Sequence, residues 1–419
     1  MNRRSAFLRA GHLPTLVAAL VYFDVSFMVW VLLGPLAPFL RDDLGLTSTQ
    51  QGLLTAIPLL GGSIFRPVLG FAADRIGARR TALIGLVLTL VPLAAGWMLA
   101  SALWHFYALG LLLGIAGASF AVALPMAARW YPPEFQGLAM GIAGAGNSGT
   151  LFATMFAPRI AERFGWPSAF GFAMIPVVVA FAVVTLLAKT SPRKVAPATA
   201  SSYAAVFRDP DTFWLAGLYS LTFGGFVGLA SFLTTFFHVQ FGLSRVSAGD
   251  FTTAVVVAGS ALRPVGGWIA DRIGGYRLLV VLLAGFSVCF AAVAVTSSAT
   301  TALVLLFIGM GMLGMGNGAV FQVVPQRFPA SLGIVTGIVG AAGGLGGFLL
   351  PTLLGATKDL TGEYRAGLWI VAFAFMAGSV VLLELGTRWA RQWPATAVQQ
   401  SGVFSYRAKS LGVPSGDSA

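Results

Sequence analysis

The stretch Arg66-Pro-Val-Leu-Gly-Phe-Ala-Ala-Asp-Arg-Ile-Gly77 occurs a second time, 197 residues further along the chain, as Arg263-Pro-Val-Gly-Gly-Trp-Ile-Ala-Asp-Arg-Ile-Gly274. Each copy ends a long apolar run and places one arginine eight residues before the aspartate of a charged loop. On a helix, eight residues rise about 12 Å, and half of a bilayer's hydrocarbon core is about 15 Å thick. Arg66 and Arg263 are therefore predicted to lie near the midplane of a membrane. Two positive charges at matching positions indicate a central site for an anion.

The composition also indicates a membrane protein. Of the 419 residues, 57% are hydrophobic and 10% are charged, and the mean hydropathy is +0.85. A soluble domain carries about 25% charged residues, so this chain could not cover a surface that faces water. Its length accommodates about twelve spans of roughly 20 residues in a lipid bilayer.

The excess of basic residues, 26 against 14 acidic ones, gives a net charge of +12. These residues are scattered over short loops and form no patch, so we expect no nucleic-acid partner. With the N-terminus in the cytoplasm, eighteen basic residues fall on the cytoplasmic side and six on the other, besides Arg66 and Arg263. Positively charged loops are retained in the cytoplasm, so both termini are predicted to lie there.

The residues that usually build catalytic or metal sites are few. The single cysteine, Cys289, excludes an internal disulfide and a cysteine-based metal site. The three histidines are far apart in the sequence, and no pairing of a nucleophile with a base is evident. We therefore expect no enzyme activity, no catalytic residues, no metal and no cofactor.

The apolar runs divide into two sets of six. Residues 1–188 are predicted to form an N-terminal six-helix half, and residues 212–392 a C-terminal one. The longest polar stretch, residues 189–211, is interpreted as a cytoplasmic linker, and the polar tail 393–419 is expected to be disordered. An even number of spans in two pseudo-symmetric halves predicts an all-α membrane protein of twelve transmembrane helices, which matches the major facilitator fold.

The loops that follow the repeated arginines resemble the cytoplasmic loop motif of the major facilitator superfamily. The motif residues are Gly70, Asp74 and Arg75 in the first copy, and Gly267, Asp271 and Arg272 in the second. Asp74 and Asp271 are expected to pair with arginines or helix N-termini and to hold the two halves closed on the cytoplasmic side. The alternative is that they are ordinary loop charges.

A charged side chain at the centre of a bilayer costs about 2.5–3.5 kcal/mol even on lenient scales, which makes Arg66 and Arg263 functional candidates. Within the predicted spans only Asp24 and Glu384 are acidic, and Glu384 is expected near the cytoplasmic end of its helix. About one positive charge is then left without an acidic partner. A guanidinium binds planar oxyanions through two parallel hydrogen bonds, so an anionic ligand would suit this site.

Glycine-rich runs from Gly137 to Gly149 and from Gly333 to Gly347 are predicted to form the fifth helix of each half. Glycine allows very close helix contact in membranes, and packing alone would explain these runs as well as a role beside a substrate. Packing does not explain Asn147, the one strongly polar group of the first run, which we interpret as a site residue. The second run has no equivalent asparagine.

Several stretches resemble the nitrate/nitrite porter family, and the resemblance extends over nearly all of residues 14–388. They are the first span from Ser26, the run from Gly114 to Phe120, the connection Arg129 to Gly137, Gly146-Asn147-Ser-Gly149 and Gly314-Met-Gly-Asn317-Gly318. The resemblance implies that Arg66 and Arg263 clamp an anion, with Asn147 as the polar residue of the glycine signature. It also implies a hydroxyl donor, Tyr219, and aromatic walls at Phe120 and Phe223.

The resemblance implies a secondary active transporter that moves nitrate or nitrite across the bacterial cytoplasmic (inner) membrane by alternating access, as a monomer. A porter for another small anion or an organic carboxylate is the alternative within transport. An anion-binding membrane sensor is the alternative of a different class.

Asp24 bears on how such transport is driven. Importing an anion against an inside-negative potential costs about 2.3 kcal/mol per charge per 100 mV, and a carboxyl group that carries a proton would offset this. As a structural residue, Asp24 would only pair with a polar neighbour. The family contains proton symporters and nitrate/nitrite exchangers, so protons and a counter-transported anion both stay open as coupling partners.

Overall fold

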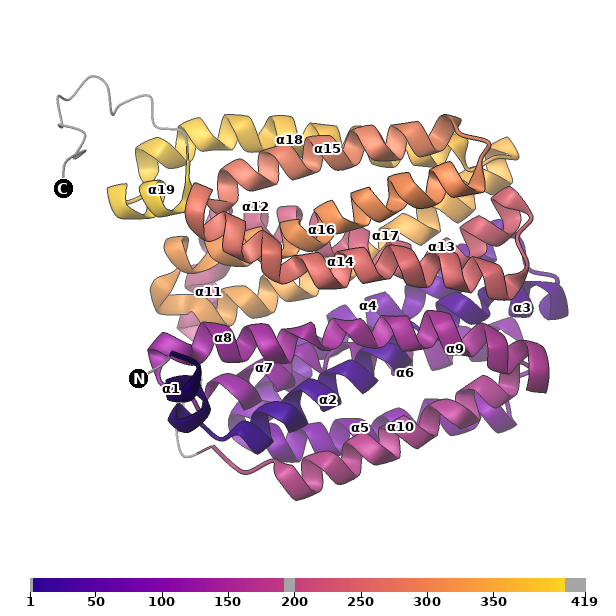
Figure 1. The fold of residues 1–419 in the computed structure, drawn as a ribbon, viewed down its shortest axis with the longest axis horizontal. Helices are drawn as coiled ribbons and strands as arrows, with labels where there is room; N and C mark the ends of the chain where they lie inside the picture. The colour runs from indigo at the N-terminus through magenta and orange to yellow at the C-terminus, as the bar shows by residue number, and fades with distance from the viewer. Residues whose placement is uncertain (1–2, 192–199, 404–419) are drawn as a thin grey trace.

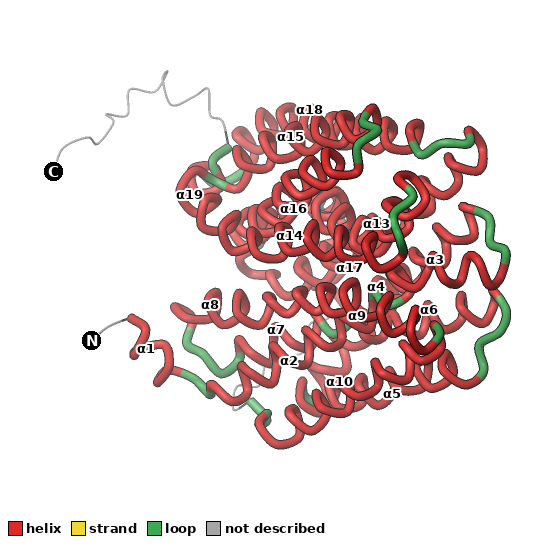
Figure 2. Tube along the Cα trace, turned by 45° about the vertical axis from the view of Figure 1, so that its right-hand side comes forward, coloured by secondary structure: helices red, strands yellow, loops and turns green. Residues whose placement is uncertain are grey.

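The computed structural model describes residues 3–191 and 200–403, and within these ranges every regular element is a helix. Figure 1 shows long helices lying side by side, and Figure 2 shows that the loops between them gather at the ends of the bundle. One end carries α1 and α19, and we call it the terminal end. The opposite end is called the distal end.

The elements of the first half are α1 (Arg3–Ala10), α2 (Leu13–Trp30), α3 (Leu33–Leu44), α4 (Ser48–Arg75), α5 (Ala78–Met98), α6 (Leu103–Gly117), α7 (Phe120–Ala128), α8 (Pro133–Gly144), the short turn η1 (Ala145–Ser148), α9 (Gly149–Phe164) and α10 (Trp166–Leu187). The remaining elements are α11 (Ala200–Arg208), α12 (Pro210–Tyr219), η2 (Ser220–Gly224), α13 (Gly225–Phe241), α14 (Arg245–Ile273), α15 (Gly275–Val295), α16 (Ala299–Arg327), η3 (Pro329–Ser331), α17 (Leu332–Thr361), α18 (Arg365–Gln392) and α19 (Ala395–Ser401).

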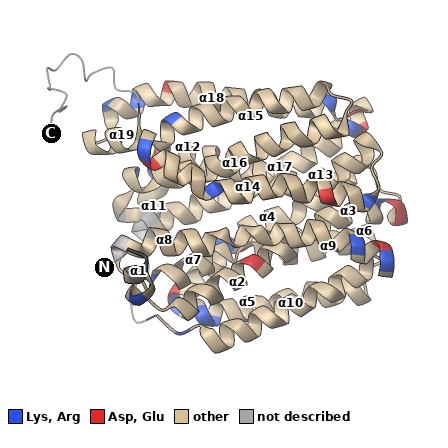
Figure 3. Cartoon of the chain, in the orientation of Figure 1, with Lys and Arg blue, Asp and Glu red and all other residues tan. Residues whose placement is uncertain are grey.

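Eleven helical stretches in the described residues are long and apolar enough to cross a membrane. A further helical stretch, α8–η1–α9, is interrupted by the turn η1. Together they agree with the twelve spans expected from the sequence. Figure 3 shows that the charged residues lie mostly towards the two ends of the bundle, as the cost of placing charge in hydrocarbon predicts.

Four of these stretches are broken near their middle. The regular α-helix is interrupted between α2 and α3, between α6 and α7, at η1, and at the π-helical turn η2. Pro35 accounts for the first break, because its ring clashes with the carbonyl group four residues earlier and it has no N–H to donate. The other breaks coincide with predicted site residues, since α7 begins at Phe120, η1 contains Asn147 and η2 contains Phe223.

The polar segments contain more helix than the sequence predicts. The predicted linker includes α11, and the predicted disordered tail includes α19, where Ala397 and Val398 are buried. Just before α19, Trp393 donates a hydrogen bond of 2.8 Å from its indole N–H to the buried carboxylate of Asp211. The expectation of disorder is therefore wrong for residues 395–401, whereas residues 192–199 and 404–419 lie outside the described ranges.

Candidate functional site

Arg66 lies on α4, eighteen residues after the helix begins, and its side chain is buried. Its Nε donates a hydrogen bond of 3.3 Å to the carbonyl oxygen of Gly117 in the same half. Its Nη1 donates to the carbonyl oxygen of Gly340 on α17, in the other half. The guanidinium therefore bridges the two halves through backbone acceptors.

Aromatic rings surround this guanidinium. Its central carbon lies 5.3 Å from the ring centroid of Trp30, 5.6 Å from that of Phe120 and 5.3 Å from that of Phe223. Such contacts attract a cation to the ring face, and they gain strength where water is excluded. The rings also keep the local dielectric low, which strengthens any contact between Arg66 and an anion.

Arg263 occupies the same place on α14, eighteen residues after that helix begins. Its side chain is only partly buried, and it interacts electrostatically with Arg66 and with Tyr219. Its Nη1 is buried without a hydrogen-bond partner among the described residues. Among the described residues, no ion pair involves Arg66 or Arg263. Both arginines therefore lack an acidic partner there.

Tyr219 ends α12, and its ring stacks on that of Phe223 at a centroid distance of 5.0 Å. Phe321 of α16 meets Tyr219 edge-on at 5.0 Å and lies 6.2 Å from Phe120, which links the aromatic walls of the two halves. Sequence reasoning missed Phe321 and Trp30. One sequence feature could have indicated Phe321, because it follows Asn317 by one helical turn. The chain has 33 phenylalanines, however, and the sequence alone does not distinguish this one.

Asn147 and Asp24 lie together on the N-terminal half. In the amide orientation that satisfies its hydrogen bonds, Asn147 donates to the carbonyl oxygens of Gly144 and Ala145, at 3.1 and 3.3 Å. The hydroxyl of Ser148 donates to Asp24 at 2.6 Å. The structure thus joins Asp24 to the glycine signature, and neither Asn147 nor Asp24 hydrogen-bonds to one of the two arginines.

The glycines of the fifth helices differ in how tightly they are packed. A Cβ at Gly149 would overlap the backbone of Asp24, and one at Gly344 would overlap the hydroxyl of Ser63 in the opposite half. In contrast, Gly141 and Gly337 face open space. Close approach is therefore required at those glycines that touch α2, α4 or the segment from Tyr219 to Phe223, where a Cβ at Gly346 would overlap the Ser220 carbonyl oxygen.

The loop motif differs from its expected arrangement. Asp74 forms an ion pair of 2.5 Å with Arg129, but both residues belong to the N-terminal half. Asp271 is exposed, and Arg75 and Arg272 lie over the rings of residues 71 and 268 of their own helices, at 4.5 and 3.8 Å. In this conformation Asp74 thus pairs with an arginine of its own half, and the contact between the halves at these loops stays a prediction. Gly70 and Gly267 lie on the helix turns just before the loops.

Besides the contacts of Arg66 and Ser63 near the middle, polar ties between the halves lie at the distal end. Asp359 of α17 accepts hydrogen bonds from the backbone N–H groups of Ser48 and Thr49, at 2.9 and 2.7 Å, and so caps α4 of the opposite half. Further ties are the ion pairs Arg245–Asp42 and Arg159–Asp250, and the hydrogen bonds Gln51–Thr235 and Thr154–Thr253.

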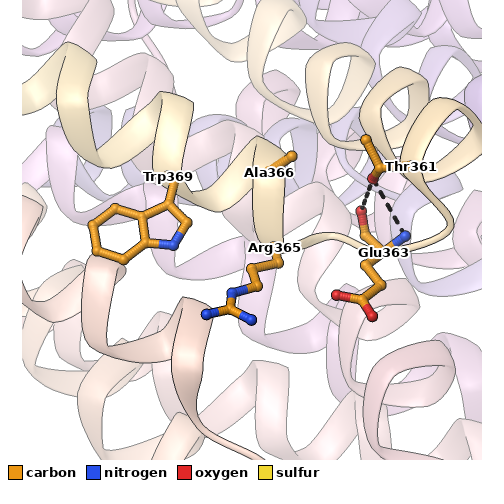
Figure 4. Close-up of a pocket in the computed structure, with 5 residues that line it drawn as sticks. All are labelled: Thr361, Glu363, Arg365, Ala366 and Trp369. Atoms are coloured by element: carbon orange, nitrogen blue, oxygen red, sulfur yellow. Dashed lines mark hydrogen bonds between the residues drawn. The ribbon is translucent and has the colours of Figure 1, made fainter.

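The surface pocket drawn in Figure 4 lies at the turn between α17 and α18 and is lined by Thr361, Glu363, Arg365, Ala366 and Trp369. It is about 30 Å along α17 from Gly340, so it is separate from the arginine site. Among the described residues, no cluster of three or more His, Cys, Asp or Glu could hold a metal ion.

A family profile described as Major Facilitator Superfamily matches residues 18–351. The chain is 36% identical over 384 residues to the "Probable nitrate/nitrite transporter NarK2" of Mycobacterium tuberculosis, covering 89% of this chain and 97% of that protein. It is 34% identical over 365 residues to the "Nitrite extrusion protein" of Bacillus subtilis, covering 85% and 90%.

Solved structures share the fold at low sequence identity. The D-xylose–proton symporter matches with a TM-score of 0.73 and 17% identity, covering 88% of this chain and 96% of that one. The xylose transporter XylE of E. coli matches with a TM-score of 0.75 and 13% identity, covering 90% and 98%. These matches confirm the all-α, twelve-helix fold. On the family profile and the relatives above, the chain belongs to the nitrate/nitrite porter family of the major facilitator superfamily.

Proposed function

We propose that this protein is a secondary active transporter that moves nitrate or nitrite across a membrane by alternating access. The observation that carries the proposal is the pair Arg66 and Arg263, one from each half, which interact with each other and have no carboxylate partner among the described residues. The names of the relatives narrow the anion to nitrate or nitrite.

The chemistry of the site suits such an anion. Each guanidinium offers a planar fork of donors that matches a planar oxyanion, and Tyr219 adds a hydroxyl that faces both charges. Two like charges close together in a low dielectric repel each other, so an anion placed between them lowers the energy of the closed arrangement. Binding would thereby favour the approach of the halves, and release would favour their separation.

The charge distribution suggests the orientation. We infer that both termini are cytoplasmic and that the protein acts as a monomer in the bacterial cytoplasmic membrane. The distal end would then face outward, and its ties between Asp359 and α4 would close the site to the outside. The loop-motif charges at the terminal end would form contacts between halves only when the site faces outward.

Asp24 is proposed as a proton carrier. It is half-buried, accepts a hydrogen bond from Ser148, and lies beside the turn that holds Asn147. A proton taken up there would be carried within the half that supplies Arg66. Exchange of nitrate for nitrite, without a proton, is the alternative coupling.

The experiment is uptake of labelled nitrate into proteoliposomes that contain the purified protein. We expect Arg66→Lys and Arg263→Lys each to abolish uptake, because an ammonium cannot reproduce the fork. Arg365→Lys, at the distal surface, is the matched control and should transport like the wild type. Full uptake by both clamp variants would refute the arginine site, and absence of uptake by the wild type would refute the substrate.

A further inference from the structure

The two halves can be aligned through their packing as well as through the repeat. Gly114 of α6 packs on α4 at Gly61 and Gly62, where a Cβ would overlap the backbone. Gly314 of α16 packs in the same way on Gly259 of α14, which corresponds to Gly62 under the 197-residue shift of the repeat. Gly114 and Gly314 therefore correspond. Three residues further on, Gly117 corresponds to Asn317.

This correspondence places the side-chain amide of Asn317 at the position that contacts the arginine in the other half. Gly117 is the residue whose carbonyl oxygen accepts the hydrogen bond from Arg66 Nε. Its counterpart Asn317 is completely buried, and neither its Oδ1 nor its Nδ2 has a hydrogen-bond partner among the described residues. Burial of a polar group without a partner costs its full desolvation, so such a group calls for a functional explanation.

The surroundings of Asn317 lead to the arginine site. The next residue, Gly318, packs against the backbone of Arg263, and a Cβ there would lie 2.6 Å from the Arg263 carbonyl oxygen. Phe321, one turn further along the same face of α16, touches Tyr219 in the aromatic wall. Arg263 Nη1 is itself buried without a partner in the described part of the chain. A donor and an acceptor that both lack partners thus belong to helices α14 and α16, which touch where Gly318 meets the backbone of Arg263.

We propose that Asn317 is the positioning residue for Arg263 when an anion is bound. The inference rests on the proposed arginine site. In the anion-bound protein, Asn317 Oδ1 accepts a hydrogen bond from Arg263 Nη1 and fixes the plane of the guanidinium, as the Gly117 carbonyl does for Arg66. Asn317 thereby supplies the amide that the second glycine-rich helix lacks, but from α16 instead of α17.

The test separates anion binding from folding. Asn317→Leu keeps the branched shape and removes the amide, and Asn317→Asp keeps the shape and places a carboxylate beside Arg263. Ser231→Ala is the matched control, because the hydroxyl of Ser231 is also buried without a partner among the described residues but lies on α13. For each purified protein, the melting temperature is measured with and without sodium nitrate, and the nitrate Kd is measured by titration.

We expect Asn317→Leu to melt at or above the wild-type temperature without nitrate, because an unpartnered buried amide has been removed. Its nitrate affinity should fall about tenfold, which corresponds to one charge-assisted hydrogen bond. Asn317→Asp should bind nitrate still more weakly than Asn317→Leu, because its carboxylate forms an ion pair with Arg263 and competes with nitrate for that guanidinium. Ser231→Ala should bind nitrate within about twofold of the wild type.

A lower melting temperature with an unchanged nitrate Kd in Asn317→Leu would show a purely structural role and overturn the inference. If that variant does not fold, nitrate binding by Asn317→Asp that equals the wild type would overturn the inference instead. A wild type without a nitrate-induced shift, or an Arg263→Lys variant that binds normally, would refute the anion site itself. The two failures are therefore distinguishable.

Discussion

Arg66 and Arg263 stand at equal depths on corresponding helices, yet their surroundings differ. Arg66 is buried, donates to two carbonyl oxygens and lies among three aromatic rings. Arg263 is partly exposed and keeps a buried Nη1 without a partner among the described residues. A duplicated sequence has thus produced one arginine that is fixed and one that can still change its contacts.

The difference extends to the neighbouring residues. Ser63, one turn before Arg66, donates at 2.8 Å to the carbonyl oxygen of Ala341 in the other half. Its counterpart Ser260, one turn before Arg263, has a buried hydroxyl with no partner in the described part of the chain. The N-terminal half therefore provides a preformed wall, and the C-terminal half provides the hydrogen-bonding capacity that a ligand can use. Preformed contacts lower the cost of ordering on binding, and adjustable ones allow release.

The strongest test of the difference between Arg66 and Arg263 is the free energy of unfolding of their variants without substrate. Arg66→Lys should lower the free energy of unfolding by about 2 kcal/mol, because hydrogen bonds to a charged group contribute about 1.5–3 kcal/mol each and an ammonium cannot reach both carbonyls. Arg263→Lys should lower it by less than about 1 kcal/mol. Unfolding of both variants in detergent checks this. Equal losses would remove the distinction between a fixed and an adjustable arginine.

A smaller effect is expected at the hydroxyl between the two charges. Tyr219→Phe should reduce nitrate affinity about tenfold, because one hydrogen bond to the anion is lost. Its stability should stay close to that of the wild type, since the ring contacts with Phe223 and Phe321 remain. Tyr364→Phe is the control, because that hydroxyl is also buried but lies near the distal end. An equal loss of affinity in both variants would argue against a hydroxyl donor at residue 219.

The smallest effect is expected from a substitution of Asp24. It tests whether the N-terminal half, which holds Arg66, takes part in coupling to protons. Asp24→Asn can still accept the hydrogen bond from Ser148, so nitrate/nitrite exchange without a pH gradient should change by less than about twofold. Accumulation driven by an imposed pH gradient should fall severalfold if Asp24 carries the proton. Unchanged pH-driven accumulation in proteoliposomes would exclude that role.

The sequence predicted those features of the fold and the site that depend on local pattern. The repeat predicted matching positions for the two arginines on two long helices, and the apolar runs predicted the spans. The carbonyl oxygens of Gly117 and Gly340 were not predictable, because every residue has a carbonyl and only packing brings these two to Arg66. The ordered segment α19 was missed for a similar reason, since the preceding Trp393 is held by Asp211, which is 182 residues away in the chain.

The capping of α4 by Asp359 has a mechanical consequence. Side-chain hydrogen bonds among the described residues join helices α4 and α17 in two regions, through Asp359 at the distal end and through Arg66 and Ser63 near the middle. The contacts of Asp359 and Arg66 are eighteen residues apart on α4 and nineteen on α17, a lever arm of about 27 Å. Two helices that are hydrogen-bonded in two separate regions cannot rotate against each other. The hydrogen bonds in one region have to break before the other region can serve as a hinge. Water can hydrate Asp359 and the N–H groups of α4 once their hydrogen bonds break, but it cannot reach the buried hydrogen bond between Arg66 and Gly340. The contact at the distal end is therefore the one that opens first.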